Sequence, residues 1–162
     1  VDTDMRKGYT HNLFNVENTK GLSDILSGKM AVERAIQPLS MAGFDFIARG
    51  AVPPNPAELL MHKNFDALLS WASQNYEIVV LDTPPILAVT DAAIIGNYVG
   101  TTLLVARFEQ NTAKEIEVSV RRFEQSGVIV KGCILNGIIK KASSYYSYGY
   151  NHYGYTYTDN KK

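Results

Sequence analysis

The stretch that decides the fold is Tyr76-Glu-Ile-Val-Val-Leu-Asp-Thr-Pro-Pro85, a short apolar run that ends at a carboxylate. Its four consecutive apolar residues, Ile78 to Leu81, are typical of a strand buried on both faces, as in a parallel sheet between helical layers. Asp82 then lies at the carboxyl end of the strand, where open α/β sheets bind ligands, so it is a candidate ligand for Mg²⁺ beside a nucleotide. The two prolines end the strand because proline cannot donate to a sheet ladder. A strand that merely ends in an Asp turn is the alternative interpretation.

A second group of acids opens the chain, in Val1-Asp-Thr-Asp-Met-Arg6. We interpret these residues as the end of a second strand that runs into two carboxylates and an arginine. Asp2 and Asp4 are two positions apart, so on an extended segment their side chains point the same way. The Arg6 guanidinium can bind a nearby phosphate. Together with Asp82, three acids are expected at one sheet edge, which is costly unless a cation or basic group compensates them. A chain that starts inside a strand is also expected to be a fragment.

These two stretches resemble known motifs. Residues 1–6 are similar to the Walker A′ motif, and Val79-Val-Leu-Asp-Thr-Pro-Pro85 to the Walker B motif, of bacterial tyrosine kinases of the Wzc type, autokinases that control capsule and exopolysaccharide export. The resemblance covers essentially all 162 residues. One departure is that the chain contains no G-x-x-x-x-G-K-[ST] phosphate loop, which in that family precedes the Walker A′ strand. The resemblance therefore implies that residues 1–142 are the carboxyl-terminal part of a P-loop kinase domain and that residues 143–162 are its tail.

The composition sets further bounds. With 46% hydrophobic and 20% charged residues, the chain fits one globular domain with a substantial core. Sixteen basic and sixteen acidic residues give no net charge, so no nucleic-acid partner is expected. We expect the single cysteine, Cys133, to be a buried thiol, since it lies in an apolar run. No stretch approaches the ~20 apolar residues that cross a bilayer, but the resemblance implies that the intact protein is anchored in the bacterial inner membrane, with this part on the cytoplasmic face.

Strands and helices are expected to alternate along the chain. Asn55 as N-cap and Pro56 at the first helical position give a strong helix start. The other elements expected are helices beginning near residues 21, 90 and 111, and strands at 44–47, 101–106 and 130–135. Short connections between such elements predict βαβ crossovers and a parallel sheet covered by helices. With the resemblance, the expected fold is the α/β fold of P-loop NTPases related to ParA and MinD.

The resemblance also implies roles for Tyr9 and Asn136, and two arginines are candidates for binding phosphate or nucleotide. Tyr9 matches a tyrosine inside the kinase domain whose phosphorylation regulates proteobacterial members. Arg49 is then the candidate that binds the Tyr9 phosphate with two hydrogen bonds, the alternative being a solvated loop arginine. Arg107, at the end of the 101–106 strand, is placed to reach phosphates or the adenine site, unless it forms a structural ion pair. Asn136 ends the last strand, where related P-loop proteins contact the adenine base with an asparagine.

The last twenty residues differ from the rest of the chain. They contain no aliphatic side chain, so they cannot bury a core, and we expect them to be mobile. They could form an adhesive segment, stacking platforms for single-stranded nucleic acid, or a phosphoacceptor cluster. Stacking platforms normally come with basic residues, which the cluster lacks, whereas each phosphate would add roughly −1.5 to −2 charges and could switch assembly. The motifs favour phosphoacceptors, and the seven tyrosines concerned are Tyr145, Tyr146, Tyr148, Tyr150, Tyr153, Tyr155 and Tyr157.

Together, these observations predict an ATP-dependent protein-tyrosine autokinase. Asp2 and Asp82 would hold Mg²⁺, Asp4 would orient or deprotonate the acceptor hydroxyl, and Arg6 would help balance the acids. The resemblance implies that subunits phosphorylate each other's tails within a ring, and that a low-molecular-weight tyrosine phosphatase and the polysaccharide export machinery are partners. Two rivals stay open: a ParA/MinD-like ATPase switch without kinase activity, and an inactive docking fragment without its phosphate loop.

Overall fold

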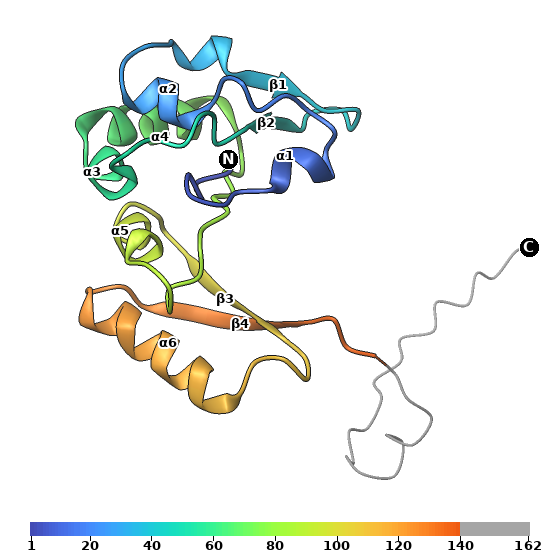
Figure 1. The fold of residues 1–162 in the computed structure, drawn as a ribbon, viewed down its shortest axis with the longest axis vertical. Coiled ribbons are helices and arrows are strands. Elements are labelled where there is room, and N and C mark those ends of the chain that lie inside the picture. Colours follow the sequence, from blue (N-terminus) through green and yellow to red (C-terminus); the bar gives the residue numbers. More distant parts are fainter. Residues whose placement is uncertain (140–162) are drawn as a thin grey trace, which may run out of the picture.

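The computed structural model describes residues 1–139, so the predicted tail at 143–162 lies outside the described residues. Figure 1 shows two groups of elements, with α1 to α4, β1 and β2 at one end, α6, β3 and β4 at the other, and α5 between them. The elements in order are α1 (Thr10–Leu13), α2 (Leu22–Leu26), the 3₁₀ turn η1 (Val32–Arg34), β1 (Ile36–Pro38), β2 (Asp45–Ile47), α3 (Pro56–Leu60), α4 (Lys63–Asn75), α5 (Asp91–Gly96), β3 (Thr102–Arg107), α6 (Ala113–Gln125) and β4 (Val130–Asn136).

The predicted α/β class is confirmed by the β3–α6–β4 unit. β3 and β4 pair in parallel, in a register that runs from Thr102 beside Val130 to Arg107 beside Asn136. α6 connects them and lies along one face of the pair (Figure 1), where Phe123 joins a core cluster with Leu104. The strand expected at 44–47 is also present, as β2, but it pairs antiparallel with β1. The described part of the chain therefore contains two separate two-stranded sheets, one antiparallel (β1–β2) and one parallel (β3–β4).

The stretch at 78–81 is not the doubly buried strand that its sequence predicts. Only an isolated parallel bridge, between Asp2 and Asp82, is formed there. The side chains of Ile78 and Val80 are 80% and 66% exposed. The reason is that the segment is paired on one side alone within residues 1–139, by the amino-terminal residues, while β3 belongs to a separate sheet. The four apolar residues of this stretch therefore predicted its burial wrongly.

The core consists of two clusters that hold the site's segments in place. In the larger cluster α2, α3 and α4 contribute their buried apolar positions, and Met5, next to the acids, is fully buried with them. On α4 the buried residues Phe65, Leu68 and Ala72 recur at helical spacing, which gives the helix one apolar face. The smaller cluster joins α5 to α6 and consists of Ile86, Ala92, Ala93, Phe123 and Val128. The helical region expected from Pro56 consists of two helices, α3 and α4. The helix expected near residue 90 is α5, which ends at Gly96.

Local chemistry explains where α6 begins and ends. The Thr112 hydroxyl accepts from the Glu115 amide at 3.2 Å, and the Glu115 carboxylate accepts from the Thr112 amide at 2.7 Å. This reciprocal capping box satisfies two amides that have no partner inside the helix. Gly127, with φ of 77°, stops the helix in the left-handed conformation that glycine adopts without strain.

The expectation that Cys133 is buried is wrong, because its thiol is exposed. Cys133 lies on β4, whose only partner among residues 1–139 is β3, so the strand is left half covered. Leu103, Val105 and Ile134 on the same pair of strands are exposed as well. None of the helices in the described part of the chain is both long and apolar enough to span a membrane.

Candidate functional site

Two of the predicted acids are placed side by side by backbone pairing. The Asp82 amide donates to the carbonyl of Val1 at 2.9 Å, and the amide of Thr3 donates to the carbonyl of Asp82 at 2.8 Å. The Thr3 hydroxyl makes a further short hydrogen bond to the same carbonyl. On its other side the Asp2 amide donates to Ile47 of β2 at 2.9 Å. The segment with Asp2 therefore lies between β2 and the segment with Asp82, so two of the three predicted acids are on adjacent segments.

Asp2 is the most constrained of the acids. Its side chain is fully buried, and Oδ1 accepts from the Asp4 amide at 3.2 Å. Oδ2 is buried without a hydrogen-bond partner among residues 1–139. Burial, and next the charge of Asp82, raise the pKa of the Asp2 carboxyl above its usual value. A buried oxygen without a partner, beside a second carboxylate, is an arrangement that a cation would stabilise.

Asp82 is held by a residue that sequence reasoning did not single out. The Thr10 hydroxyl, at the start of α1, donates to Asp82 Oδ2 at 2.6 Å. Thr10 follows Tyr9 directly, so the segment with the predicted regulatory tyrosine contacts the Walker B carboxylate. A threonine in a polar loop gives no sequence signal for such a contact, because it depends on the loop folding back over the strand end.

Asp4 organises a tight turn immediately after the bridge. Its Oδ1 accepts from the amides of Arg6 at 3.0 Å and Lys7 at 2.9 Å, and its carbonyl accepts from the Gly8 amide at 2.8 Å. Gly8 lies so close to Asp2 that a Cβ on Gly8 would overlap the Asp2 carboxylate. The turn of residues 4–8 therefore needs glycine at its end, and it keeps Asp4 at the same edge as Asp2.

Arg6 does not face the acids at the sheet edge. Its Nε donates to Asp91 Oδ2 at 2.9 Å and its Nη2 to Asp91 Oδ1 at 3.1 Å. The Asp91 side chain is 0% exposed and the Arg6 side chain 39% exposed. The hydrogen bond with Asp91 raises the pKa of the Arg6 guanidinium. Sequence reasoning missed Asp91, because an acid in the first turn of a helix is common and carries no sign of a distant partner.

Tyr9 and Arg49 are brought close together. Tyr9 is 66% exposed at the start of α1. The Arg49 Nε donates to the carbonyl of Gly8 at 3.0 Å and its Nη1 to the carbonyl of Gly50 at 2.9 Å. Arg49 therefore contacts the peptide group that leads into Tyr9, and it is not a freely solvated loop arginine.

Arg107 and Asn136 form a second, separate pair. They are register partners at the carboxyl ends of β3 and β4. The Asn136 carbonyl accepts from the Phe108 amide at 2.8 Å, and Asn111 Oδ1 accepts from the Arg107 amide at the same distance. Both side chains are exposed. Nothing in residues 1–139 contacts the Arg107 guanidinium as an ion pair, so the structural ion pair considered for it is not formed there.

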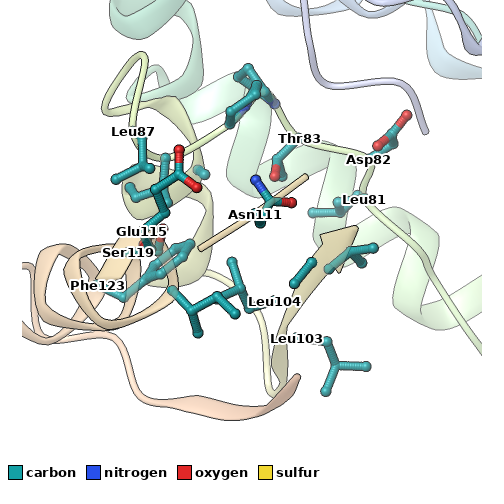
Figure 2. A pocket seen from close by; sticks show the side chains of 17 residues that line it. Leu81, Asp82, Thr83, Leu87, Leu103, Leu104, Asn111, Glu115, Ser119 and Phe123 are labelled. Atoms are coloured by element: carbon teal, nitrogen blue, oxygen red, sulfur yellow. Dashed lines mark hydrogen bonds between the residues drawn. The ribbon is translucent and has the colours of Figure 1, made fainter. Parts of the chain in front are cut away.

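A cavity of about 330 Å³ lies between the segment that carries Asp82 and the β3–α6 unit. Figure 2 shows Asp82 and Thr83 on one side of it and Glu115, Ser119 and Phe123 of α6 on the other. Its size is that of small-ligand sites in general. Arg107 and Asn136 are not among its lining residues. The cavity connects a predicted metal ligand to side chains of α6 that sequence reasoning did not assign to any site.

The acids suit a metal that is shared with a ligand. Within residues 1–139 no group of three or more acidic, histidine or cysteine side chains is arranged to hold a metal ion alone. Mg²⁺ commonly takes one or two carboxylates and completes its shell with water and substrate phosphates. Asp2 and Asp82 meet that requirement.

Comparison with known proteins places these features in a family. No protein-family model matches the chain. The tyrosine-protein kinase wzc of Salmonella typhi is 57% identical over 155 residues, which is 96% of this chain and 22% of that protein. The etk-named tyrosine-protein kinase of Escherichia coli K12 is 57% identical over 148 residues, 91% of this chain and 20% of that protein. A Klebsiella pneumoniae protein named for a tyrosine-protein kinase in the cps region is 67% identical over 146 residues, 90% of this chain and 20% of that protein.

Solved structures agree with the sequence comparison. The kinase domain of Escherichia coli tyrosine kinase ETK superposes with a TM-score of 0.84 at 58% identity, covering 92% of this chain and 58% of that one. In fold, the chain therefore matches the kinase domains of bacterial tyrosine kinases. In sequence, it is homologous to one segment of the Wzc- and Etk-type tyrosine-protein kinases, which confirms the resemblance seen in the motifs. It spans about a fifth of the length of these relatives.

Proposed function

We propose that the chain is part of an ATP-dependent protein-tyrosine autokinase that regulates the polymerisation and export of a capsular polysaccharide or exopolysaccharide. The observation that carries the proposal is the backbone bridge that sets Asp2 beside Asp82, with Asp4 in the turn that follows. The kinase names of its relatives and the cps region in one of those names support it.

Asp2 and Asp82 would hold Mg²⁺, which would neutralise phosphate charge when bound. The buried Asp2 Oδ2 without a hydrogen-bond partner among residues 1–139, on a segment paired with that of a second carboxylate, favours a cation at this position. Phosphoryl transfer depends on positioning and charge neutralisation more than on covalent chemistry by the protein. The two acids would hold the cation that supplies this positive charge, and the backbone bridge between their segments would fix its position.

Asp4 would orient the tyrosine hydroxyl that accepts the phosphoryl group, or take its proton. One oxygen of Asp4 is occupied by the amides of its own turn, which fixes the carboxylate and leaves Oδ2 for a substrate. The acceptors would be the tail tyrosines at positions 145–157, phosphorylated between subunits of a ring. A phenol with a pKa near 10 needs such help to become a nucleophile.

Tyr9 would be a regulatory phosphorylation site and Arg49 its phosphate-binding partner. Arg49 contacts the carbonyl of Gly8, the residue before Tyr9, at 3.0 Å, and the Tyr9 side chain is exposed, which supports this assignment. Planar guanidinium groups bind phosphate with paired hydrogen bonds. Arg107 would reach the phosphates or the adenine site and Asn136 the adenine base, and their position side by side at the strand ends supports this assignment.

The intact protein would be anchored in the inner membrane and act on its cytoplasmic face. Its partners would be other copies in the ring, a low-molecular-weight tyrosine phosphatase and the polysaccharide export machinery. The rivals, a ParA/MinD-like ATPase switch and an inactive docking fragment, are less consistent with relatives that are named as tyrosine kinases.

The test is phosphosite mapping by mass spectrometry on the full-length protein after treatment with Mg·ATP. We expect phosphate on several of the tyrosines between positions 145 and 157, and loss of that phosphate in Asp4→Asn. Glu124→Gln, on the exposed side of α6, is the matched control and should retain it. An unmodified tail in a protein that still hydrolyses ATP would reject the kinase and favour the ATPase switch.

A further inference from the structure

The ion pair between Arg6 and Asp91 connects the two segments that carry the acids. Arg6 follows Asp4 by two positions, and Asp91 begins α5, nine residues after Asp82. Two hydrogen bonds, at 2.9 and 3.1 Å, join the guanidinium to both carboxylate oxygens. Of the three ion pairs in the described part of the chain, it is the one with a fully buried partner.

The buried end of this pair is firmly fixed. Asp91 opens α5, whose Ala92 and Ala93 lie in the core cluster with Phe123. The connection that leads from Asp82 to α5 is held as well, because Arg122 Nη1 donates to the carbonyls of Ile86 at 3.0 Å and Leu87 at 2.8 Å. Asp91 is therefore a rigid point on the Walker B side of the site.

The other end of the pair is the turn of residues 4–8. A buried carboxylate without its partner is strongly unfavourable, so Asp91 requires Arg6 to stay in place. The Arg6 amide in turn donates to Asp4 Oδ1 at 3.0 Å. The position of Asp4 is thus coupled, through one residue, to α5.

We propose that Asp91 is a positioning residue, which acts through Arg6 to hold the 4–8 turn so that Asp4 faces the acceptor tyrosine. The inference rests on the proposed function, and it changes the role predicted for Arg6 from balancing the acids to tethering the turn. Asp91 itself does not contact the reacting groups. Its contribution lies in the geometry of Asp4, so it affects turnover and leaves nucleotide binding unchanged.

The test compares Asp91→Asn and Arg6→Lys in the full-length protein. Arg6→Lys keeps a positive charge against the buried carboxylate but cannot make the two-bonded contact, so it tests the same link if Asp91→Asn fails to fold. The control is Arg121→Gln, which removes an ion pair with Glu117 of 2.6 Å on the exposed side of α6. We expect kcat for tail phosphorylation to fall about 10- to 100-fold in both variants, with KM for Mg·ATP unchanged, because small misplacements of catalytic groups have effects of this size. The control should match the parent.

A double variant and a second readout complete the test. If Asp91 acts through Arg6, the double variant Arg6→Lys with Asp91→Asn loses no more activity than the worse single variant, whereas independent roles would multiply the two losses. Hydrogen exchange of the amides of residues 4–8 should become about tenfold faster in each single variant. This readout needs no kinase activity, so a protein that fails to phosphorylate its tail but shows the faster exchange would reject the proposed function and keep the tether. Folded variants with the parent's kcat and exchange, or multiplied losses, would overturn the tether.

Discussion

Gly8→Ala tests whether the close packing of the acidic site is needed for its chemistry. A Cβ at position 8 would lie 2.5 Å from the carbonyl oxygen of Asp4 and would also overlap both carboxylate oxygens of Asp2. Ordinary contact begins at 3.4 Å. The Asp4 carbonyl and the Asp2 carboxylate would therefore have to move by about 0.9 Å or more from the new methyl group.

The shift falls on the two groups that the proposed mechanism needs in place. A misplacement near 1 Å reduces turnover by about 100-fold, and forcing a methyl group into packed surroundings destabilises a fold by about 1–3 kcal/mol. We expect Gly8→Ala to remain folded and to phosphorylate its tail about 100-fold more slowly than the parent. The rate is measured in the full-length protein by anti-phosphotyrosine detection over time, and stability by urea unfolding of the same preparation.

Gly100→Ala is the matched control, because a Cβ there would meet nothing within 4 Å. It carries the same chemical change outside the site and should leave the rate unaltered. If Gly8→Ala phosphorylated its tail at the parent's rate, the close approach of Gly8 to Asp2 would have no role in catalysis, and the rigid site argued above would be wrong.

Three further predictions concern charge, pH and helix capping. Burial and the charge of Asp82 raise the pKa of Asp2, so the ionised form of Asp2 lowers the stability of the metal-free protein. Asp2→Asn should therefore stabilise the metal-free protein and abolish the stabilisation by Mg²⁺, which in the parent is about 2.7 kcal/mol at a hundred times Kd. Calorimetry that still shows stabilisation of Asp2→Asn by Mg²⁺ would contradict the metal role. The Tyr76 hydroxyl donates to Asp45 at 2.6 Å, which raises the pKa of Tyr76 from 10.0 to about 12. The folded state thus holds this proton more tightly, so the contribution of the hydrogen bond to stability is complete below pH 10 and is lost as pH rises towards 12. In urea unfolding, the difference in stability between the parent and Tyr76→Phe should shrink across that range. A constant difference would argue against the hydrogen bond. Thr112→Ala removes the cap of α6 and should cost about 1 kcal/mol in urea unfolding, whereas an unchanged midpoint would show that the capping box contributes nothing.

Local sequence signals predicted most of the elements. The helix expected to begin near residue 111 is present as α6, and Asn55-Pro56 marks the start of α3. These signals depend on contacts within a few residues, so they can be read without the fold. The acids were expected at one edge because the carboxyl ends of neighbouring parallel segments meet there, and the bridge between Asp2 and Asp82 pairs two of these segments.

The burial of individual side chains was harder to predict from the sequence. Ile78 and Cys133 lie in apolar runs, and both are exposed. An apolar run indicates that burial of the segment would be favourable, but the chain topology decides which neighbours cover it. In this structure each segment is paired on one side only among residues 1–139.

The sequence by itself determined the α/β class and the family resemblance, since these depend on periodicity and on short motifs. Only the tertiary structure decided that Arg6 pairs with Asp91 across 85 positions and that Thr10 bonds Asp82 across 72. Such contacts join residues that are distant in the chain and ordinary in their local context. Their partners become known only when folding brings the two segments together.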